Sequence, residues 1–430
     1  MIRLVLIVLI AVSKAMDISA PKSGERLLAA WLDTTNLPNG ATGDRPASLN
    51  ARMGFNFGAF QYGQNLPITD YPFPEEQVYA TNTNALVYLT VYNLNDPWSV
   101  TEDQIKNLTM QCGKLNANGR PVLLRFWPEM NGNWFTYGQQ PSEFIAVWKK
   151  VYNKLRVDAP LTKMVWAPSS GNGYPYNYPI TIGSQNSVKE NQASVVTSQN
   201  FQLLDTNGDG IVNAEDDSFS PYYPGDEFVD WIGMSVYHYA GHKYPWDFNW
   251  IPYSGKFVDV MNINGFYDQY ATQKNKPFMI AESGAAYHTN TLTNPEDPHA
   301  PVPTELEVKQ PWWRQYVTNS TFLDLYPKIH LICLFEFYKP EELQRDKVTP
   351  DWRDFRITVN DTIRNAFLKD FQAVSSLYSQ AVAITPTKSN STAASSTTAA
   401  TPSSVDATQA SSASTNRYVF LFLPFLLLVI

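Results

Sequence analysis

Two glutamates each follow a short apolar run, Glu129 after PVLLRFWP and Glu282 after PFMIA. A run of this kind, bounded by Gly and Pro, predicts a buried strand of a parallel sheet, and the polar residues that follow it lie at the carboxyl edge. Both carboxyls are therefore expected at one edge. Two carboxyls facing one sugar bond suit glycoside hydrolysis, which needs an acid/base and a nucleophile. The alternative for Glu282 is an exposed loop acid, and the Ser-Gly that follows it argues against that.

Aromatic residues crowd around Glu129, and Phe135 and Tyr137 are among them. Their rings can stack on the apolar faces of sugars, and their apolar surroundings raise the pKa of a carboxylic acid. Trp127, Asn131 and Trp134 are therefore predicted to contact substrate. Arg125 is predicted to orient the carboxylates, with a purely structural ion pair as the alternative.

The segment RFWPEMNGNWFTYG, residues 125–138, resembles the acid/base segment of glycoside hydrolase family 26, whose members include β-mannanases. The resemblance is closest to fungal-type, GPI-anchored members. Lys339-Pro-Glu-Glu and the stretch from Asp351 to Arg356 resemble their closing segment, so the resemblance spans about residues 25–375. Bacterial mannanases of the family usually carry His before the acid/base, where this chain has Pro128. That departure bears on the substrate more than on the reaction.

The resemblance implies Glu129 as acid/base and Glu282 as nucleophile of a retaining, endo-acting hydrolase. It implies a β-linked polysaccharide as substrate, with β-mannan as the first expectation. It also implies that Tyr237 hydrogen-bonds the nucleophile and that Trp134 stacks on a sugar. His238 either lines the site or is a hydrogen-bonded bystander.

Eight apolar runs predict eight strands, alternating with helical patterns, which favours an α/β fold of the (β/α)8 TIM-barrel class. The predicted strands are Leu27–Asp33, Gly54–Phe60, Ala85–Tyr92, Pro121–Glu129, Met164–Pro168, Phe228–Tyr237, Pro277–Gly284 and Ile329–Phe337. Helices are predicted at Ala47–Arg52, Thr101–Asn116, from Pro141 to about Leu155, and at Val258–Thr272.

A calcium-loop insertion is predicted between strands five and six. The stretch DTNGDGIVNAED, residues 205–216, places oxygens at loop positions 1, 3, 5 and 12, a glycine at 6 and a backbone carbonyl at 7. The predicted ligands of a structural Ca²⁺ are Asp205, Asn207, Asp209, the carbonyl of Ile211, and Asp216. The alternative is an Asx-rich turn without metal.

Both ends of the chain have unusual composition. Residues 1–15 predict a signal peptide, with a buried first strand as the alternative. Residues 16–380 form the expected catalytic domain, and residues 381–417 a Ser/Thr-rich stalk. The apolar residues 418–430 match a GPI signal and are short for a membrane span. A secreted protein, GPI-anchored at the cell surface or cell wall, is therefore expected.

The net charge of −8 and the lack of a basic cluster argue against nucleic acid as a partner. A monomer is expected, with membrane contact through the GPI anchor alone. Four sequons, at Asn107, Asn319, Asn360 and Asn390, predict a glycoprotein. The two cysteines, Cys112 and Cys333, could pair in an oxidising compartment or remain free in the core, and we favour the second.

Two rival functions remain at this point. The same scaffold could serve a non-catalytic glycan-binding protein of the cell wall. It could also serve a transglycosylase that remodels the wall, in which a sugar hydroxyl replaces water at the second step. The presence of both Glu129 and Glu282 favours an enzyme over a binder.

Overall fold

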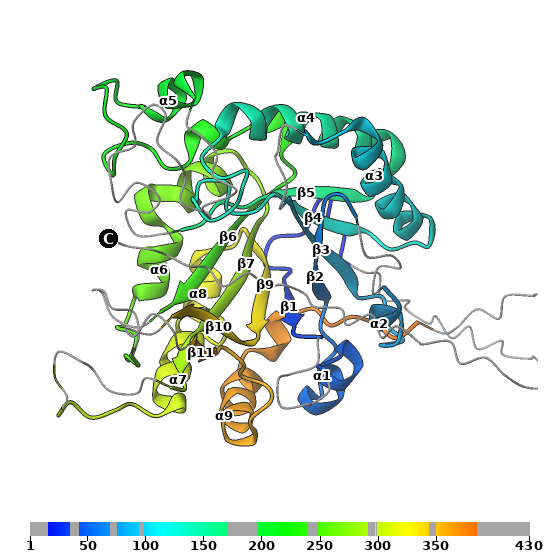
Figure 1. Cartoon of the computed structure of the whole chain (residues 1–430). Helices are drawn as coiled ribbons and strands as arrows, with labels where there is room; N and C mark the ends of the chain where they lie inside the picture. The colour runs from blue at the N-terminus through cyan, green and yellow to red at the C-terminus, as the bar shows by residue number, and fades with distance from the viewer. Residues whose placement is uncertain are drawn as a thin grey trace, which may run out of the picture.

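Eight parallel strands close into a barrel in the computed structural model, which confirms the predicted (β/α)8 fold (Figure 1). The structure describes residues 16–34, 43–68, 75–93, 99–170, 197–239, 248–290, 297, 299–343 and 350–384. The barrel strands, in spatial order, are β1 (Leu27–Leu32), β2 (Ala59–Asn65), β3 (Leu86–Tyr92), β4 (Val122–Phe126), β5 (Thr162–Trp166), β6 (Trp231–His238), β7 (Phe278–Ala285) and β9 (Ile329–Glu336).

Alternate residues of each strand belong to two separate cores. In β1, Leu28 and Ala30 pack outward against the helices, whereas Leu27, Ala29 and Trp31 fill the barrel interior. Because both faces are buried, the strands read as continuous apolar runs rather than as alternating patterns.

Helices surround the barrel (Figure 1). They are α1 (Pro46–Met53), α2 (Glu75–Tyr79), α3 (Glu102–Ala117), α4 (Pro141–Asp158), α5 (Ser198–Leu204), α6 (Lys256–Met261), α7 (Glu305–Tyr316), α8 (Ser320–Leu325) and α9 (Asp361–Gln372). The helices predicted near α1, α3 and α4 are confirmed. Thr101 begins α3 with a capping box to Gln104, a strong sequence signal for a helix start.

Two predicted elements were placed wrongly. The second strand begins at Ala59, not at Gly54, because Gly54 adopts a left-handed conformation that ends α1. The single helix predicted over Val258–Thr272 is broken, because Asn264 has a positive φ of 52°. The chain there forms α6, a 3-10 turn and the π-helix Tyr267–Gln273.

A small antiparallel sheet lies beside the barrel mouth. It contains β8 (Tyr287–His288), β10 (Tyr338–Leu343) and β11 (Pro350–Asp354), in the order β10-β11-β8. β8 follows β7 and β10 follows β9 after one residue each, so the sheet stands at the carboxyl ends of these strands. It thereby covers one side of the place where the predicted carboxylates are expected.

The other end of the barrel is closed by the first described residues. Met16 and Ile18 are buried in the interior core, and the backbone oxygen of Ile18 accepts a 2.8 Å hydrogen bond from the indole of Trp231. The predicted signal peptide, stalk beyond residue 384, and GPI tail lie outside the described residues. No helix in the described ranges is both long and apolar enough to cross a membrane.

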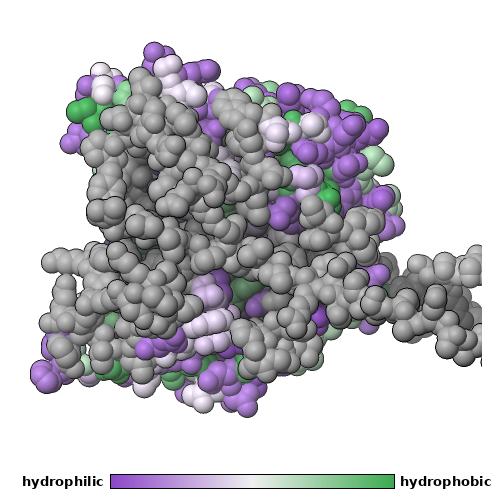
Figure 2. All heavy atoms as spheres, viewed as in Figure 1, coloured by the Kyte–Doolittle hydropathy of each residue, from purple (hydrophilic) through white to green (hydrophobic). Residues whose placement is uncertain are grey.

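Both cysteines are free and buried, as favoured from the sequence. Cys112 lies on α3 in the outer core, and Cys333 lies on β9 in the interior core. On the side seen in Figure 2, the described surface over α3 and α4 is largely hydrophilic. Met110 of α3 and Val157 of α4 are exposed, and single exposed apolar side chains are normal for a protein surface.

Candidate active site

The two predicted carboxylates meet at one guanidinium group. Arg125 of β4 donates from one terminal nitrogen to Glu282 Oε1 of β7. Its other terminal nitrogen lies 3.8 Å from Glu129 Oε1. Arg125 is buried, with 1% of its surface exposed, so this charge interacts with both acids in a poorly solvated setting. The predicted orienting role of Arg125 fits this geometry.

Two further donors hold the carboxylate of Glu282. Besides Arg125, the hydroxyl of Tyr237 donates to Oε2 at 2.8 Å and the amide of Gln61 donates to Oε1 at 3.0 Å. Burial, and then the charge of Glu282, raise the pKa of Tyr237, so its phenol keeps the proton that it donates. An anion fixed by donors on its oxygens is suited to attack as a nucleophile.

Glu129 has a different environment. Its side chain is 17% exposed, and its Oε2 accepts a 2.9 Å hydrogen bond from the indole of Trp134. Burial raises the pKa of Glu129; Arg125 opposes the rise and Glu282 adds to it. One carboxyl with a raised pKa beside another that is held by donors is the arrangement of a general acid next to a nucleophile.

The loop after β4 is unusually constrained. Trp127 and Glu129 both have a positive φ, of 47° and 55°, which is rare for residues other than glycine and often marks functional sites. Their backbone nitrogens donate to Val91 O at 2.8 Å and to Ala167 O at 2.9 Å. The loop is thereby tied to the ends of β3 and β5, which fixes the direction of the acid.

Gly132 makes room for the indole that binds the acid. A Cβ at this position would lie 2.5 Å from ring atoms of Trp134. We expect Gly132→Ala to displace the ring from Glu129 and to lower kcat/KM about tenfold or more, as for loss of a hydrogen bond to a charged group. Steady-state kinetics on a soluble polysaccharide would measure this.

Trp134→Phe serves as the comparison variant, because it removes the indole N–H and retains a ring for stacking. Its kcat/KM should also fall, whereas its KM should change less than that of Gly132→Ala. Wild-type kinetics for Gly132→Ala would show that the indole position does not matter to the acid.

Three side chains that were predicted to contact substrate, those of Trp127, Asn131 and His238, contact other parts of the protein in the structure. Trp127 is fully buried and stacks between Phe126 and Tyr137, with ring centroids 5.0 and 5.1 Å away, so it packs the core. Both ends of the Asn131 amide bind the backbone of Ser169, which joins two loops. In this structure both side chains are engaged with the protein itself, because the positive φ values of Trp127 and Glu129 end the regular alternation of the strand.

His238 hydrogen-bonds other parts of the protein in this structure, an arrangement that fits the bystander alternative. Its Nε2 donates to the backbone oxygen of Trp250 at 2.7 Å, and its Nδ1 accepts from Lys256 at 2.9 Å. Burial lowers the pKa of Lys256 to about 8. The successive residues Tyr237 and His238 face opposite sides of β6, so only the tyrosine reaches Glu282.

Two residues of the site were missed from the sequence. Ser235 of β6 accepts from Arg125 at 2.6 Å and also hydrogen-bonds Glu129, so it bridges the cation and the acid. Gln61 of β2 donates to Glu282. Each is a polar residue in a strand that is buried on both faces, and that pattern could have singled them out.

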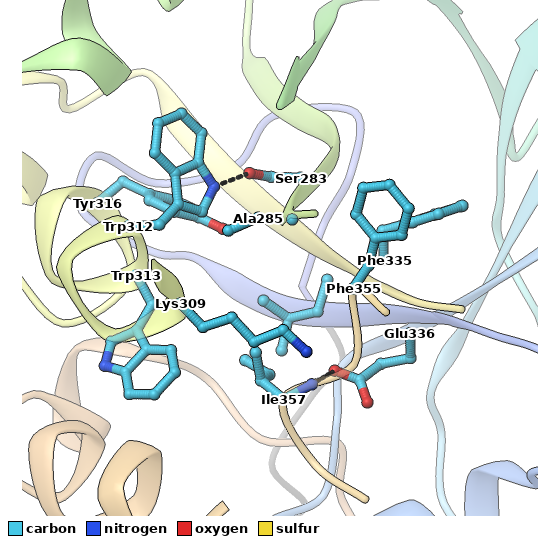
Figure 3. Close-up of a pocket in the computed structure, with 12 residues that line it drawn as sticks. Ser283, Ala285, Lys309, Trp312, Trp313, Tyr316, Phe335, Glu336, Phe355 and Ile357 are labelled. Atoms are coloured by element: carbon cyan, nitrogen blue, oxygen red, sulfur yellow. Dashed lines mark hydrogen bonds between the residues drawn. The ribbon is translucent and has the colours of Figure 1, made fainter. Parts of the chain in front are cut away.

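A small cavity lies between β7, the strand that carries Glu282, and β9 and α7 (Figure 3). Trp312 donates to Ser283 Oγ at 3.2 Å, and the backbone N–H of Ile357 donates to Glu336 at 2.9 Å. Lys309, also in its lining, bonds Glu305 and the backbone oxygen of Arg356. These polar groups already have hydrogen-bond partners within the protein.

The predicted calcium loop follows α5. Asp205 Oδ2 accepts from the backbone nitrogen of Gly210 at 2.9 Å, while its Oδ1 is buried and has no hydrogen-bond partner. Asn207 and Asp209 accept from the nitrogens two residues on, at 2.9 and 2.8 Å, the second of these being Ile211 N. An unpartnered buried oxygen at position 1 of the loop fits a cation ligand.

Asp216, at position 12, has both oxygens bound to backbone nitrogens, including Thr206 N at 2.7 Å and Asn213 N at 2.9 Å. Within the described ranges, no three His, Cys, Asp and Glu side chains are grouped so that they could hold a metal. The described loop therefore has the geometry of an Asx-rich turn, with its carboxylates apart.

The model of "Glycosyl hydrolase family 26" matches residues 13–181, a stretch that includes Glu129 and ends before Glu282. A mannan endo-1,4-beta-mannosidase of Bacillus subtilis (strain 168) is 26% identical over 214 residues, or 43% of this chain. The chain spans 41% of the length of that curated relative.

Solved structures also resemble the chain. A β-mannanase of this family from Bacteroides ovatus has a TM-score of 0.46 at 14% identity, with 83% of this chain and 90% of that chain covered. An endo-beta-1,4-mannanase double mutant from Cellulomonas fimi gives 0.46 at 13% identity, covering 83% and 73%. The family model and the curated relative together support a glycoside hydrolase, and the family that this chain resembles is glycosyl hydrolase family 26.

Proposed function

We propose that the protein is a retaining endo-glycosidase that hydrolyses a β-linked polysaccharide, with β-mannan as the first candidate. The observation that carries this proposal is the shared guanidinium of Arg125, which brings Glu129 and Glu282 together at the barrel mouth in unlike environments. The curated relative that acts on mannan supports the choice of polymer.

In the proposed reaction, Glu129 protonates the glycosidic oxygen while Glu282 attacks the anomeric carbon, giving a covalent glycosyl-enzyme. Glu129, now ionised, then takes a proton from water, which attacks the same carbon and releases Glu282. Tyr237 and Gln61 hold Glu282 during both steps. Trp134 both binds the acid and presents a partly exposed ring near the scissile bond.

The test is reducing-end release from a panel of β-1,4-mannan, β-1,3-xylan, β-1,3/1,4-glucan and β-1,3-glucan. We expect release from β-1,4-mannan, with the β-configured product formed first, as seen by NMR of the fresh hydrolysate. Release from only one of the other polymers would make that polymer, and not β-1,4-mannan, the substrate. If no reducing ends are released from any of the four polymers but the protein still binds one of them, it is a glycan-binding protein and not an enzyme.

We also propose that the chain is secreted and anchored at the cell surface or cell wall through a GPI group. The composition of residues 1–15, 381–417 and 418–430 supports this. Release of the protein from intact cells by a phosphatidylinositol-specific phospholipase is the expected result. Retention after phospholipase treatment would contradict the anchor.

A structural Ca²⁺ in the loop of residues 205–216 is the third proposal, supported by the unpartnered oxygen of Asp205. Asp205, Asn207, Asp209, the carbonyl of Ile211, and Asp216 would hold it. When bound, it would stabilise the excursion between β5 and β6. We expect EDTA to lower the melting temperature by about 5 °C and added Ca²⁺ to restore it.

Asp205→Ala should abolish this response to calcium. Glu215→Ala is the matched control, because Glu215 lies in the same loop, is exposed, and occupies none of the ligand positions. An unchanged melting temperature of the wild type with EDTA would favour the metal-free turn.

A further inference from the structure

A buried row of hydrogen bonds extends behind Glu282. The thiol of Cys333 lies 3.2 Å from Gln61 Oε1, and Gln61 Nε2 lies 3.0 Å from Glu282 Oε1 and 2.8 Å from Thr90 Oγ1. All four residues are buried, and they come from four strands of the barrel, β9, β2, β7 and β3. Every polar atom of the Gln61 amide is therefore engaged.

The two ends of this amide are not interchangeable. A carboxylate only accepts, so Glu282 requires the NH₂ end of Gln61, whereas the oxygen end needs a donor. Cys333 supplies that donor through its S–H. A flipped amide would set its oxygen against Glu282 Oε1 and its NH₂ against the thiol. Thr90 can bond either end, because a hydroxyl both donates and accepts.

We propose that Cys333 is a positioning residue for catalysis: its thiol fixes the Gln61 amide with the NH₂ group toward Glu282, which keeps the nucleophile aimed. This inference rests on the proposed function. It gives a buried cysteine a task that depends on its hydrogen atom rather than on its size.

The thiol is suited to this task because it stays protonated. Burial, and then the charge of Glu282, raise the pKa of Cys333, while Arg125 lowers it less. The charged and titratable groups that face Glu282 from the packed elements are Arg125, Glu129, Tyr88, Tyr92, Tyr137, Tyr237 and Cys333. Of these, Cys333 acts on Glu282 through Gln61.

The kinetic test compares Cys333→Ala with Cys333→Ser. Loss of one neutral hydrogen bond is expected to lower kcat/KM about fivefold in the alanine variant. The acidic limb of its pH profile should move up by about half a pH unit, because a looser Gln61 favours the ionised carboxylate less. The serine variant retains a donor and should restore most of both values.

Cys112 provides the matched control. It is the other cysteine of the chain and is equally buried, but it lies in the outer core on α3. Cys112→Ala and Cys112→Ser should leave the acidic limb in place, even if they lower stability. A limb that does not move in Cys333→Ala, or that serine does not restore, would overturn the proposal.

A readout that is independent of activity separates this proposal from the proposed function. In the Cys112→Ser background, the infrared S–H stretching band arises from Cys333 alone. Gln61→Leu removes the acceptor and should shift this band to higher frequency. An unshifted band would refute the hydrogen bond. If the band shifts but the protein cleaves no polymer, the proposed hydrolase function is refuted, whereas the hydrogen bond by which Cys333 positions Gln61 is supported.

Discussion

Glu282→Ala is expected to lower kcat/KM by about 10⁴-fold or more while leaving polysaccharide binding intact. The reason is that loss of the nucleophile removes the covalent step, and such losses in other enzymes are of this order or larger. The residue is almost fully buried and binds Arg125, Tyr237 and Gln61, and alanine would remove all three of these contacts. Reducing-end assays and affinity electrophoresis measure the two quantities.

Azide gives this prediction a stereochemical readout. In Glu282→Ala, azide can occupy the space of the lost carboxylate and attack an activated β-glycoside directly, giving an α-glycosyl azide. Glu143→Ala is the matched control. Glu143 is a buried glutamate at the start of α4, outside the barrel, and it accepts a hydrogen bond from Asn200 of α5. Near-normal activity of Glu282→Ala would eliminate this residue as the nucleophile.

Glu129→Ala is expected to reduce turnover of the polysaccharide by about 10²- to 10⁴-fold, the range for general acid–base catalysis. For an aryl glycoside with a good leaving group, the rate of the first step should fall less, because that group departs without protonation. The basic limb of the pH profile should disappear, since this limb reports deprotonation of the acid. Azide should here give a β-glycosyl azide, by capture of the glycosyl-enzyme.

The raised pKa of Glu129 adds a prediction about stability. A carboxyl whose pKa is higher in the folded than in the unfolded chain stabilises the fold below the unfolded value, about 4.3, and loses this contribution as pH rises through the folded value. Glu129→Gln stays neutral and should melt at a higher temperature than the wild type at pH 7, with little difference at pH 4. Melting curves at the two pH values test this, and equal shifts at both would contradict it.

The sequence alone determined the barrel and the common location of the two candidate carboxylates. The run LLAAWL is apolar throughout, and VLLRF is apolar except for Arg125, because strands of a closed parallel barrel are buried on both faces. The position of Glu129 and Glu282 directly after or within such runs placed them at one mouth. Tyr237 and Trp134 came from the resemblance to the family, and both bind a carboxylate in the structure.

Only the tertiary structure decided which neighbours of these residues belong to the site. Trp127, Asn131 and His238 lie next to site residues in sequence, yet each is turned into the core or toward the backbone of another loop. Gln61 and Cys333 lie 272 residues apart and meet because β1 alone separates β2 from β9 in the closed barrel. A strand pattern specifies burial, but the direction of a side chain after the last strand residue depends on the φ of the loop and on contacts between distant strands.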